Sequence, residues 1–367
     1  MTKGLNMKLV KSENRSLILY LLNSTKGLSR KEIASRLGLT PAAVTKICAR
    51  LIEDGFIKED GESYEQNRSG RREIQLSLCL EDKAAFGINA EKDGITLSVS
   101  RLDGKLLKSK HIPFTADISE VIGAAVDFKK RYKGKEKLLG AGICVIGSPD
   151  EDDFGVWKDK HLKEELEAAL GLPVIIENNV KAFAESELLY GKIKNQDSIL
   201  FIKWGPGIGS AVVADGRVFN GSDSSVTELG HYIVNPGGVK CRCGRFGCLE
   251  TEAGEEVILS ELNSEIPLDE LLENCDNDIM NIIDHKIDMV ALAVTNTATI
   301  LNAENIVFFG TMFKYEIIAE KLKKQCLRYN KNLTPDIIKK SGLNKKSGYI
   351  GCTAICAKHF FFEADGR

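Results

Sequence analysis

Four residues that could ligate a metal lie close together in the chain: His231, Cys241, Cys243 and Cys248. Thiolate sulfur and imidazole nitrogen are ligands that Zn²⁺ prefers, and three cysteines with one histidine make a closed tetrahedral set. A metal bound in this way holds together a loop that has little apolar core of its own. The alternative is that these are ordinary reduced cysteines on a turn. The C-x-C-G-x-x-G-C spacing favours a structural zinc site, because its glycines let the chain bend sharply and gather the thiols.

Two glutamates, Glu228 and Glu250, bracket the four ligands. A bound metal would fix the backbone beside both of them. Their carboxylates are therefore candidates to line a pocket that the metal shapes.

The elements that must position these residues belong to a long chain of ordinary composition. It has 367 residues, of which 43% are hydrophobic and 28% charged, and a net charge of −2. This length allows two or three domains, and this charge excludes nucleic-acid binding over the whole surface while leaving room for one small basic module. The sequence opens without a signal-peptide pattern, and its apolar runs are too short to span a bilayer. We therefore expect a cytoplasmic protein without a membrane partner, whose other cysteines are reduced.

Residues 1–80 are predicted to form a winged helix-turn-helix domain. Apolar residues recur at helical spacing in residues 12–23. A second helix begins at the capping box of Ser29 and Glu32, and a third begins at Thr40 and Pro41. Two short helices joined by a tight turn, followed by two strand-like runs around a basic tip, make the winged arrangement. The alternative is a helical protein-interaction module with a solvated basic loop.

This domain is expected to bind double-stranded DNA. The third helix would enter the major groove, and the basic tip would contact phosphate or a narrow minor groove. The candidate contacts are Thr40, Ala42, Ala43, Thr45 and Lys46 on the helix, and Arg68, Arg71 and Arg72 on the tip.

Residues 81–367 alternate strand-like and helical runs, which predicts an α/β fold with mainly parallel sheets. Strands are predicted at residues 84–88, 94–101, 138–145, 172–177, 198–203, 210–214 and 305–310. Helices are predicted at residues 118–132 and 162–170, after Asn179 to about residue 190, and at residues 351–362. We detect no internal repeat. Sites in such sheets lie beyond the carboxyl ends of strands, where Gly147, Asn178 and Gly205 fall.

Three motifs resemble those of the ROK family, which groups repressors, open reading frames and sugar kinases. The most specific joins Glu228-Leu-Gly-His231 to Cys241-x-Cys243-Gly-x-x-Gly-Cys248-Leu-Glu250. The others are Gly142-Ile-Cys-Val-Ile-Gly147-Ser-Pro, like the family's strand and turn beside the sugar, and Leu172-Pro-Val-Ile-Ile-Glu-Asn-Asn179, like its strand that ends in Glu-Asn-Asp. The resemblance covers essentially the whole chain, and the winged helix marks the repressor branch. It implies a two-lobed actin-like ATPase or sugar-kinase (ribonuclease H-like) fold for residues 81–367.

The resemblance also implies roles for single residues, carried over position by position. His231, Cys241, Cys243 and Cys248 would bind zinc, and the second ring nitrogen of His231 would face a sugar. Carboxylates and amides suit a sugar, since each sugar hydroxyl both donates and accepts hydrogen bonds. The residues of the sugar site would be Gly147, Asn178, Asn179, Glu228, His231 and Glu250.

The sequence departs from the family's kinases at three places. Asn179 stands where a kinase has the aspartate that removes the proton from the attacking hydroxyl, and an amide cannot accept this proton. The phosphate-binding Asp-x-Gly-Gly-Thr turn is replaced by residues 89–94, which put Glu91 close to where phosphates would lie. Thr311 replaces a glycine beside the nucleotide. A glycine-rich turn at residues 205–209 is retained, but by itself it favours a hinge between lobes over a nucleotide site.

We therefore expect a sugar-responsive transcriptional regulator of carbohydrate metabolism, acting as a repressor and without enzymatic activity. A homodimer or homotetramer would bind a palindromic operator and respond to a sugar or sugar phosphate. The first alternative is an active sugar kinase with an appended DNA-binding domain. The second is a regulator that binds no small molecule and is controlled by a protein partner.

Overall fold

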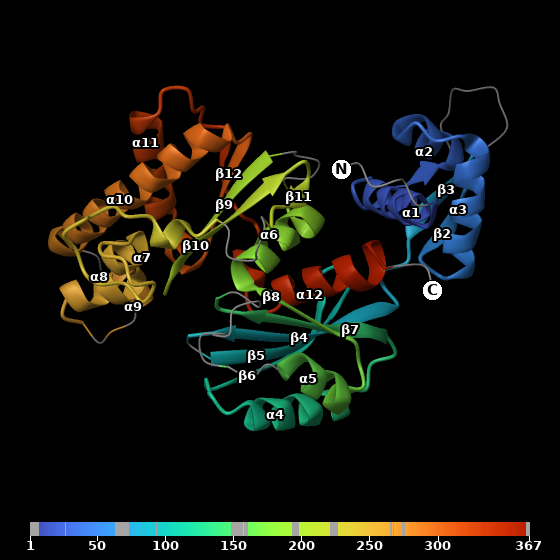
Figure 1. Ribbon diagram of the computed structural model, residues 1–367, viewed down its shortest axis with the longest axis horizontal. Coiled ribbons are helices and arrows are strands. Elements are labelled where there is room, and N and C mark those ends of the chain that lie inside the picture. Colours follow the sequence, from blue (N-terminus) through green and yellow to red (C-terminus); the bar gives the residue numbers. More distant parts are fainter. Residues whose placement is uncertain are drawn as a thin grey trace.

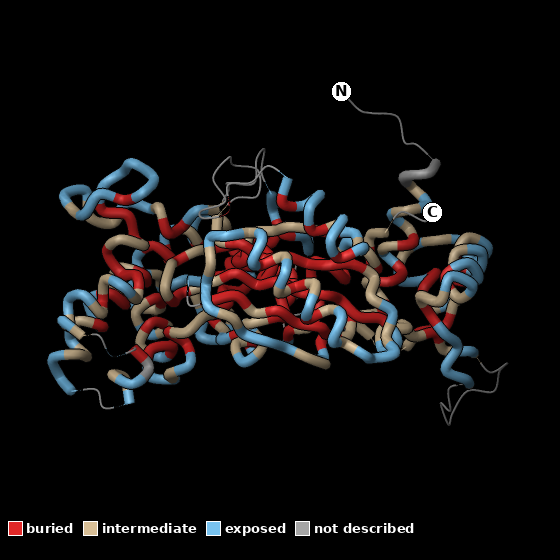
Figure 2. Tube along the Cα trace, turned by 90° about the horizontal axis from the view of Figure 1, so that it is seen from below, coloured by how far each residue is buried: buried red, intermediate tan, exposed pale blue. Residues whose placement is uncertain are grey.

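A winged helix-turn-helix domain and two α/β lobes make up the computed structural model (Figure 1). It describes residues 7–25, 27–62, 73–92, 94–147, 157, 161–192, 198–220, 227–264, 266, 268–273 and 276–364. Buried residues run through the middle of each part (Figure 2). Within the described ranges, no helix has the length and apolar character needed to cross a membrane.

The N-terminal part has the predicted winged helix-turn-helix fold. Its helices are α1 (Met7–Asn23), α2 (Arg30–Leu37) and α3 (Pro41–Glu53), and its antiparallel sheet has the order β1 (Leu28–Ser29), β3 (Ile74–Leu78), β2 (Ile57–Glu62). The predicted caps begin both short helices, because Ser29 and Glu32 form a complete capping box and the Thr40 hydroxyl accepts a hydrogen bond from the Ala43 amide. The two-residue strand β1 was not predicted, since so short a run carries no alternation. The predicted wing tip with Arg68, Arg71 and Arg72 lies outside the described residues.

The first lobe is built on a sheet with the strand order β6-β5-β4-β7-β8. Its strands are β4 (Lys83–Glu91), β5 (Gly94–Arg101), β6 (Leu106–Ile112), β7 (Lys137–Val145) and β8 (Val174–Asn178). The first three pair antiparallel, whereas β7 and β8 join in parallel. Helices α4 (Ile118–Lys130) and α5 (Leu162–Leu170) cover one face of the sheet, and α12 (Ile350–Ala357) covers the other (Figure 1).

The second lobe repeats this plan. Its sheet has the order β11-β10-β9-β12-β13, with the strands β9 (Ser198–Trp204), β10 (Ile208–Ala214), β11 (Arg217–Val218), β12 (Asn305–Phe309) and β13 (Ile338–Lys340). Strand β9 is apolar on both faces because both are covered. Leu200 and Ile202 pack towards α10 (Asn277–Leu301) and α11 (Glu316–Tyr329), while Phe201 packs towards α6 (Asn179–Tyr190). The smaller helices α7 (Leu249–Ala253), α8 (Glu255–Glu261) and α9 (Leu268–Glu273) lie beside α10 (Figure 1).

The two lobes share a topology that was not predicted, and one expectation for them is wrong. If the strands of each sheet are numbered by their order in the chain, both sheets have the spatial order 3-2-1-4-5. The lobes therefore share one topology, although the sequence shows no repeat. The sheets are also not mainly parallel. Each has two antiparallel pairings and two parallel ones, because a hairpin meander opens each lobe before the helical crossovers begin.

Helix α12 connects the lobes to the N-terminal domain. It packs on β4, β7 and α6, and its backbone approaches the sheet so closely that a Cβ on Gly142 would lie 2.2 Å from the Cys352 carbonyl oxygen. The π-helical turn η4 (Lys358–Phe362) then carries Phe361 and Phe362 into the core of the N-terminal domain. One apolar core therefore joins the C-terminal segment to the winged helix-turn-helix domain.

Arg15 of α1 fixes this junction. Its guanidinium donates to the carbonyl oxygens of Phe361, Phe362 and Ala364, at 3.2, 3.4 and 3.0 Å, and lies 4.4 Å from the centre of the Phe56 ring. The Arg15 side chain is buried, so these carbonyls lose their partner if it is removed.

Replacing Arg15 with alanine is expected to loosen the N-terminal domain from the lobes. Buried carbonyls would be left without donors, which should lower the free energy of unfolding by roughly 2 kcal/mol. Thermal unfolding and limited proteolysis between the domains would measure this. Lys11→Ala, an exposed cation one turn earlier on the same helix, is the matched control. Equal behaviour of the two variants would contradict the role of Arg15.

Candidate functional site

The four predicted metal ligands converge in the second lobe. The ligand atoms of His231, Cys241, Cys243 and Cys248 all lie within 4.8 Å of one another. The Cys241 sulfur is 3.4 Å from His231 Nδ1, and the Cys243 and Cys248 sulfurs are 3.6 Å apart. In a tetrahedron with Zn–S bonds of about 2.3 Å, ligand atoms are separated by about 3.8 Å. The donor set and its spacing therefore fit one tetrahedral metal ion.

The loop that carries the cysteines has little regular structure to hold it. Isolated bridges join Ile233 to Cys248 and Lys240 to Phe246. Gly247 makes the sharpest turn, with a φ of +65°, and a Cβ there would lie 1.4 Å from the Asn235 carbonyl oxygen. Only glycine fits at this position. Burial and hydrogen bonding with neighbouring thiols raise the pKa of Cys248 to about 12, and a bound metal would reverse this preference by taking the thiolate.

The cluster of His231, Cys241, Cys243 and Cys248, called the His–Cys cluster below, lies next to two of the predicted sugar-site residues. The 3₁₀ turn η1 (Leu229–His231) packs on β10, and a Cβ on Gly230 would lie 2.1 Å from the Ile208 carbonyl oxygen. Glu250 follows Cys248 on α7, and its carboxylate is 3.4 Å from the Ile208 amide nitrogen and 3.7 Å from Arg242. Glu228 caps η1, and its carbonyl oxygen accepts from the His231 amide.

Asn178 and Gly147 meet at the carboxyl ends of two neighbouring strands. Asn178 ends β8, and its amide donates to the Gly147 carbonyl oxygen at 2.9 Å. The Asn178 side-chain oxygen caps α6 by accepting from the Val180 and Lys181 amides. Burial raises the pKa of the preceding carboxyl, Glu177, although Lys181 opposes this shift. The two predicted residues therefore lie together, but much of the hydrogen-bonding capacity of Asn178 already serves the fold.

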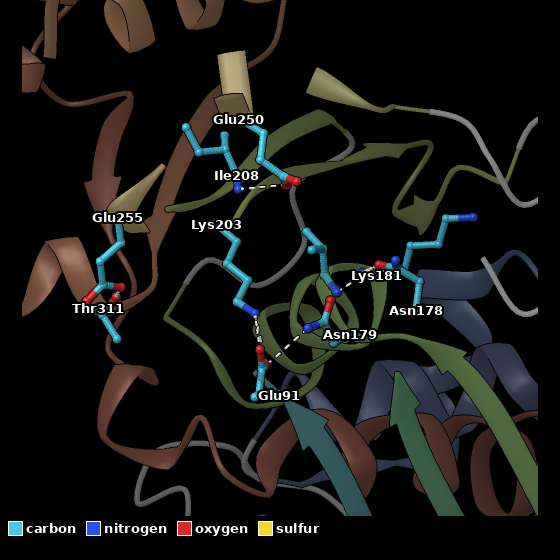
Figure 3. A network of polar contacts seen from close by, with 10 residues as sticks. Glu91, Asn178, Asn179, Lys181, Lys203, Ile208, Glu250, Glu255 and Thr311 are labelled. Atoms are coloured by element: carbon cyan, nitrogen blue, oxygen red, sulfur yellow. Dashed lines mark hydrogen bonds and ion pairs between the residues drawn. The ribbon is translucent and has the colours of Figure 1, made fainter. Parts of the chain in front are cut away.

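Asn179, the next residue, forms part of a polar group that spans both lobes (Figure 3). Its side-chain nitrogen donates to Glu91 at the end of β4, at 3.0 Å. Lys203 of β9 lies 2.9 and 2.7 Å from the two oxygens of the same carboxylate. Lys203 was not predicted as a site residue. A lysine near the end of an otherwise apolar, buried strand, just before a glycine-rich turn, was the signal that could have identified it.

The DNA-contact candidates on α3 share one surface of the N-terminal domain. Thr40, Ala42, Thr45 and Lys46 are exposed and Ala43 is half-buried, whereas Val44, Cys48 and Leu51 face the core. The Thr45 hydroxyl donates to the Pro41 carbonyl oxygen, which orients its methyl group and oxygen on the helix surface. This surface lies at the end of the molecule away from the His–Cys cluster (Figure 1).

Curated relatives are similar to this chain over most of its length. The DNA-binding transcriptional dual regulator NagC of Escherichia coli K12 is 28% identical over 286 residues, which are 72% of this chain and 70% of NagC, and the N-acetylglucosamine repressor of Escherichia coli O157:H7 matches to the same extent. The xylose repressor of Bacillus spizizenii is 24% identical over 375 residues, which are 96% of each chain.

Solved structures agree on the fold. A ROK family transcriptional regulator described as a homologue of the E. coli MLC protein superposes with a TM-score of 0.80, at 21% identity and over 96% of this chain and 97% of its own. A ROK family glucokinase from Streptomyces griseus, in complex with glucose and AMPPNP, gives a TM-score of 0.66 at 18% identity, over 75% of this chain and all of its own.

Two family profiles match the N-terminal domain and the two lobes separately. The winged helix-turn-helix DNA-binding profile matches residues 11–58, and the ROK profile matches residues 85–359. The latter covers well over half of the sequence and includes the His–Cys cluster, the glycine-rich turn and the polar group at Asn179. The chain therefore belongs to the ROK family and carries a winged helix-turn-helix DNA-binding domain at its N-terminal end.

Proposed function

We propose that this protein is a transcriptional repressor that binds operator DNA through its N-terminal domain and a sugar between its two lobes, without phosphorylating it. The winged helix-turn-helix domain is the observation that carries the first half, because kinase-type ROK structures such as the S. griseus glucokinase align with only three quarters of this chain. Relatives named N-acetylglucosamine repressor and xylose repressor support the second half.

The absence of catalysis rests on Asn179. A kinase needs a group there that takes a proton, and the Asn179 amide instead donates its hydrogen to Glu91. ATP-dependent phosphorylation of glucose, N-acetylglucosamine or xylose by the purified protein would overturn this part of the proposal. It would favour the alternative of a sugar kinase with an appended DNA-binding domain.

The proposal includes a structural zinc ion. His231, Cys241, Cys243 and Cys248 would hold the ion, which would fix the loop next to Glu250 and leave Nε2 of His231 for the sugar. Gly147, Asn178, Asn179, Glu228 and Glu250 would complete the sugar site. A homodimer or homotetramer would present two α3 helices to a palindromic operator.

Operator binding should depend on α3 and on salt. DNA duplexes selected from a random library should bind to the protein. The logarithm of the association constant should fall linearly with the logarithm of the salt concentration, because contacts to phosphates release counterions. Lys46→Ala should weaken binding about tenfold and reduce the salt slope by about one. Lys130→Ala, an exposed lysine on α4, is the control. Fluorescence anisotropy measures both variants, and the absence of any sequence-selective duplex binding would refute the repressor.

A further inference from the structure

The contact between Glu91 and Lys203 joins the lobes through a shielded ion pair. The Lys203 and Glu91 side chains are only 13% and 21% exposed, so water and salt screen their attraction weakly. Glu91 comes from the first lobe and Lys203 from the second (Figure 3). The Glu91 carboxylate thus lies at the boundary between the lobes, and Lys203 of the other lobe neutralises its charge.

Asn179 holds this carboxylate in place. Its amide nitrogen lies 3.0 Å from Glu91, and the Asn179 side chain is buried. An aspartate at this position would put two carboxylates in contact, which like charges disfavour. The amide at position 179 and the glutamate at position 91 therefore require each other.

The glycine-rich turn beside this pair is surrounded by further carboxylates. The Gly205 amide donates to the Gly207 carbonyl oxygen, and a Cβ on Gly207 would lie 3.0 Å from a Glu250 oxygen. Turns of this kind hold phosphate when their amides face an anion. In this chain an internal carboxylate packs against the turn instead.

A third carboxylate, that of Glu255, lies near the glycine-rich turn through its contact with Thr311. The Thr311 hydroxyl donates to Glu255 at 3.2 Å, and a Cβ on Gly205 would lie 2.5 Å from the Thr311 hydroxyl oxygen. Glu91, Glu250 and Glu255 thus lie around the turn (Figure 3). Lys203 pairs with Glu91, and Arg242 lies 3.7 Å from Glu250. A phosphate dianion in this position would be repelled by the surrounding acids.

We propose that the Glu91–Lys203 pair, positioned by Asn179, restricts the ligand of this site to an uncharged sugar and excludes sugar phosphates and ATP. An ammonium group has three protons and a carboxylate about four lone-pair positions, so a neutral hydroxyl can bind to the pair without breaking it. A phosphate group would compete with Glu91 for Lys203 and leave a largely buried carboxylate without its cation. This inference rests on the proposed function, because it names the ligand class of the same site.

Calorimetry with the full-length protein tests this selectivity. The probes are glucose, N-acetylglucosamine, xylose, glucose 6-phosphate, N-acetylglucosamine 6-phosphate and ATP. The wild type should bind one neutral sugar and bind its 6-phosphate at least about tenfold more weakly. Glu91→Gln should remove this preference, because Lys203 then becomes available to the phosphate group. The double variant Glu91→Gln with Lys203→Gln should again bind the 6-phosphate weakly, because the cation is gone. Lys92→Met is the matched control, because Lys92 follows Glu91 but forms an exposed pair with Glu256.

Two results would overturn the inference in different ways. Equal or tighter binding of a sugar phosphate or ATP by the wild type, or an unchanged preference in a folded Glu91→Gln protein, would refute the selectivity and leave the sugar-responsive repressor standing. No binding of any probe, with operator binding intact, would refute both the selectivity and the sugar response.

Discussion

Replacing Cys243 with serine is expected to abolish metal binding at the His231 cluster and to destabilise the second lobe. Cys243 is exposed, so the substitution removes a ligand while disturbing little packing. The loop depends on isolated bridges and on a close backbone approach at Gly247, and without metal it should detach from η1 and α7. We expect a loss of roughly 3 kcal/mol or more in the free energy of unfolding, a fraction of the ~10–16 kcal/mol that structural zinc contributes in zinc-finger peptides.

Elemental analysis and thermal unfolding would measure this effect. The wild type should contain about one zinc per chain, and Cys243→Ser should contain none. Cys79→Ser, a partly buried thiol outside the cluster, should keep the metal and the stability. A wild-type protein that is free of metal, yet resists proteolysis between residues 232 and 247, would contradict the structural role of zinc.

Replacing Lys358 with methionine is expected to destabilise the protein by roughly 3–5 kcal/mol, because it breaks a buried ion pair and leaves a carboxylate without its partner. Lys358 in η4 lies 2.8 Å from Glu185 of α6, whose side chain is 7% exposed. Burial raises the pKa of Glu185. Burial alone would lower the pKa of Lys358, but the Glu185 carboxylate raises it. The pair joins α6 to the segment that supports the N-terminal domain, so operator binding should weaken as well.

A double-mutant cycle separates the ion pair from packing. Glu185→Gln combined with Lys358→Met removes both charges and should recover most of the lost stability. A double variant as unstable as Lys358→Met would show that the methylene packing of Lys358, and not its charge, matters.

The pH dependence gives a second readout of the same variant. In Lys358→Met the Glu185 carboxyl loses the cation that lowers its pKa, so its folded-state pKa rises further above the unfolded value than in the wild type, and the folded variant takes up the proton more readily. The stability deficit relative to the wild type should therefore shrink as pH falls from 8 towards 5. The raised pKa of Lys358 in the wild type contributes stability that is lost only at alkaline pH, and it does not change in this window. Chemical denaturation at several pH values would test the sign.

The sequence by itself determined the features whose parts lie close together along the chain. The ligands His231, Cys241, Cys243 and Cys248 belong to one loop, so their spacing alone predicted that they converge. Ser29 and Thr40 cap their helices through hydrogen bonds within a single turn, and such local chemistry is visible in the residues themselves. The order of strands and helices likewise predicted an α/β fold, and the departures at Asn179, Glu91 and Thr311 were evident as residue types.

Only the tertiary structure decided which of these residues meet. Glu91 contacts residues 88 and 112 positions away, Asn179 and Lys203, and Arg15 binds carbonyl groups more than 340 positions away. Periodicity and capping act over a few turns, whereas these contacts depend on how two sheets, α12 and the N-terminal domain pack together. The shared topology of the lobes was hidden for the same reason, because a fold can repeat in strand order without repeating in sequence. The sequence therefore showed an asparagine at position 179, but the ion pair beside it could be seen only once the two lobes were brought together.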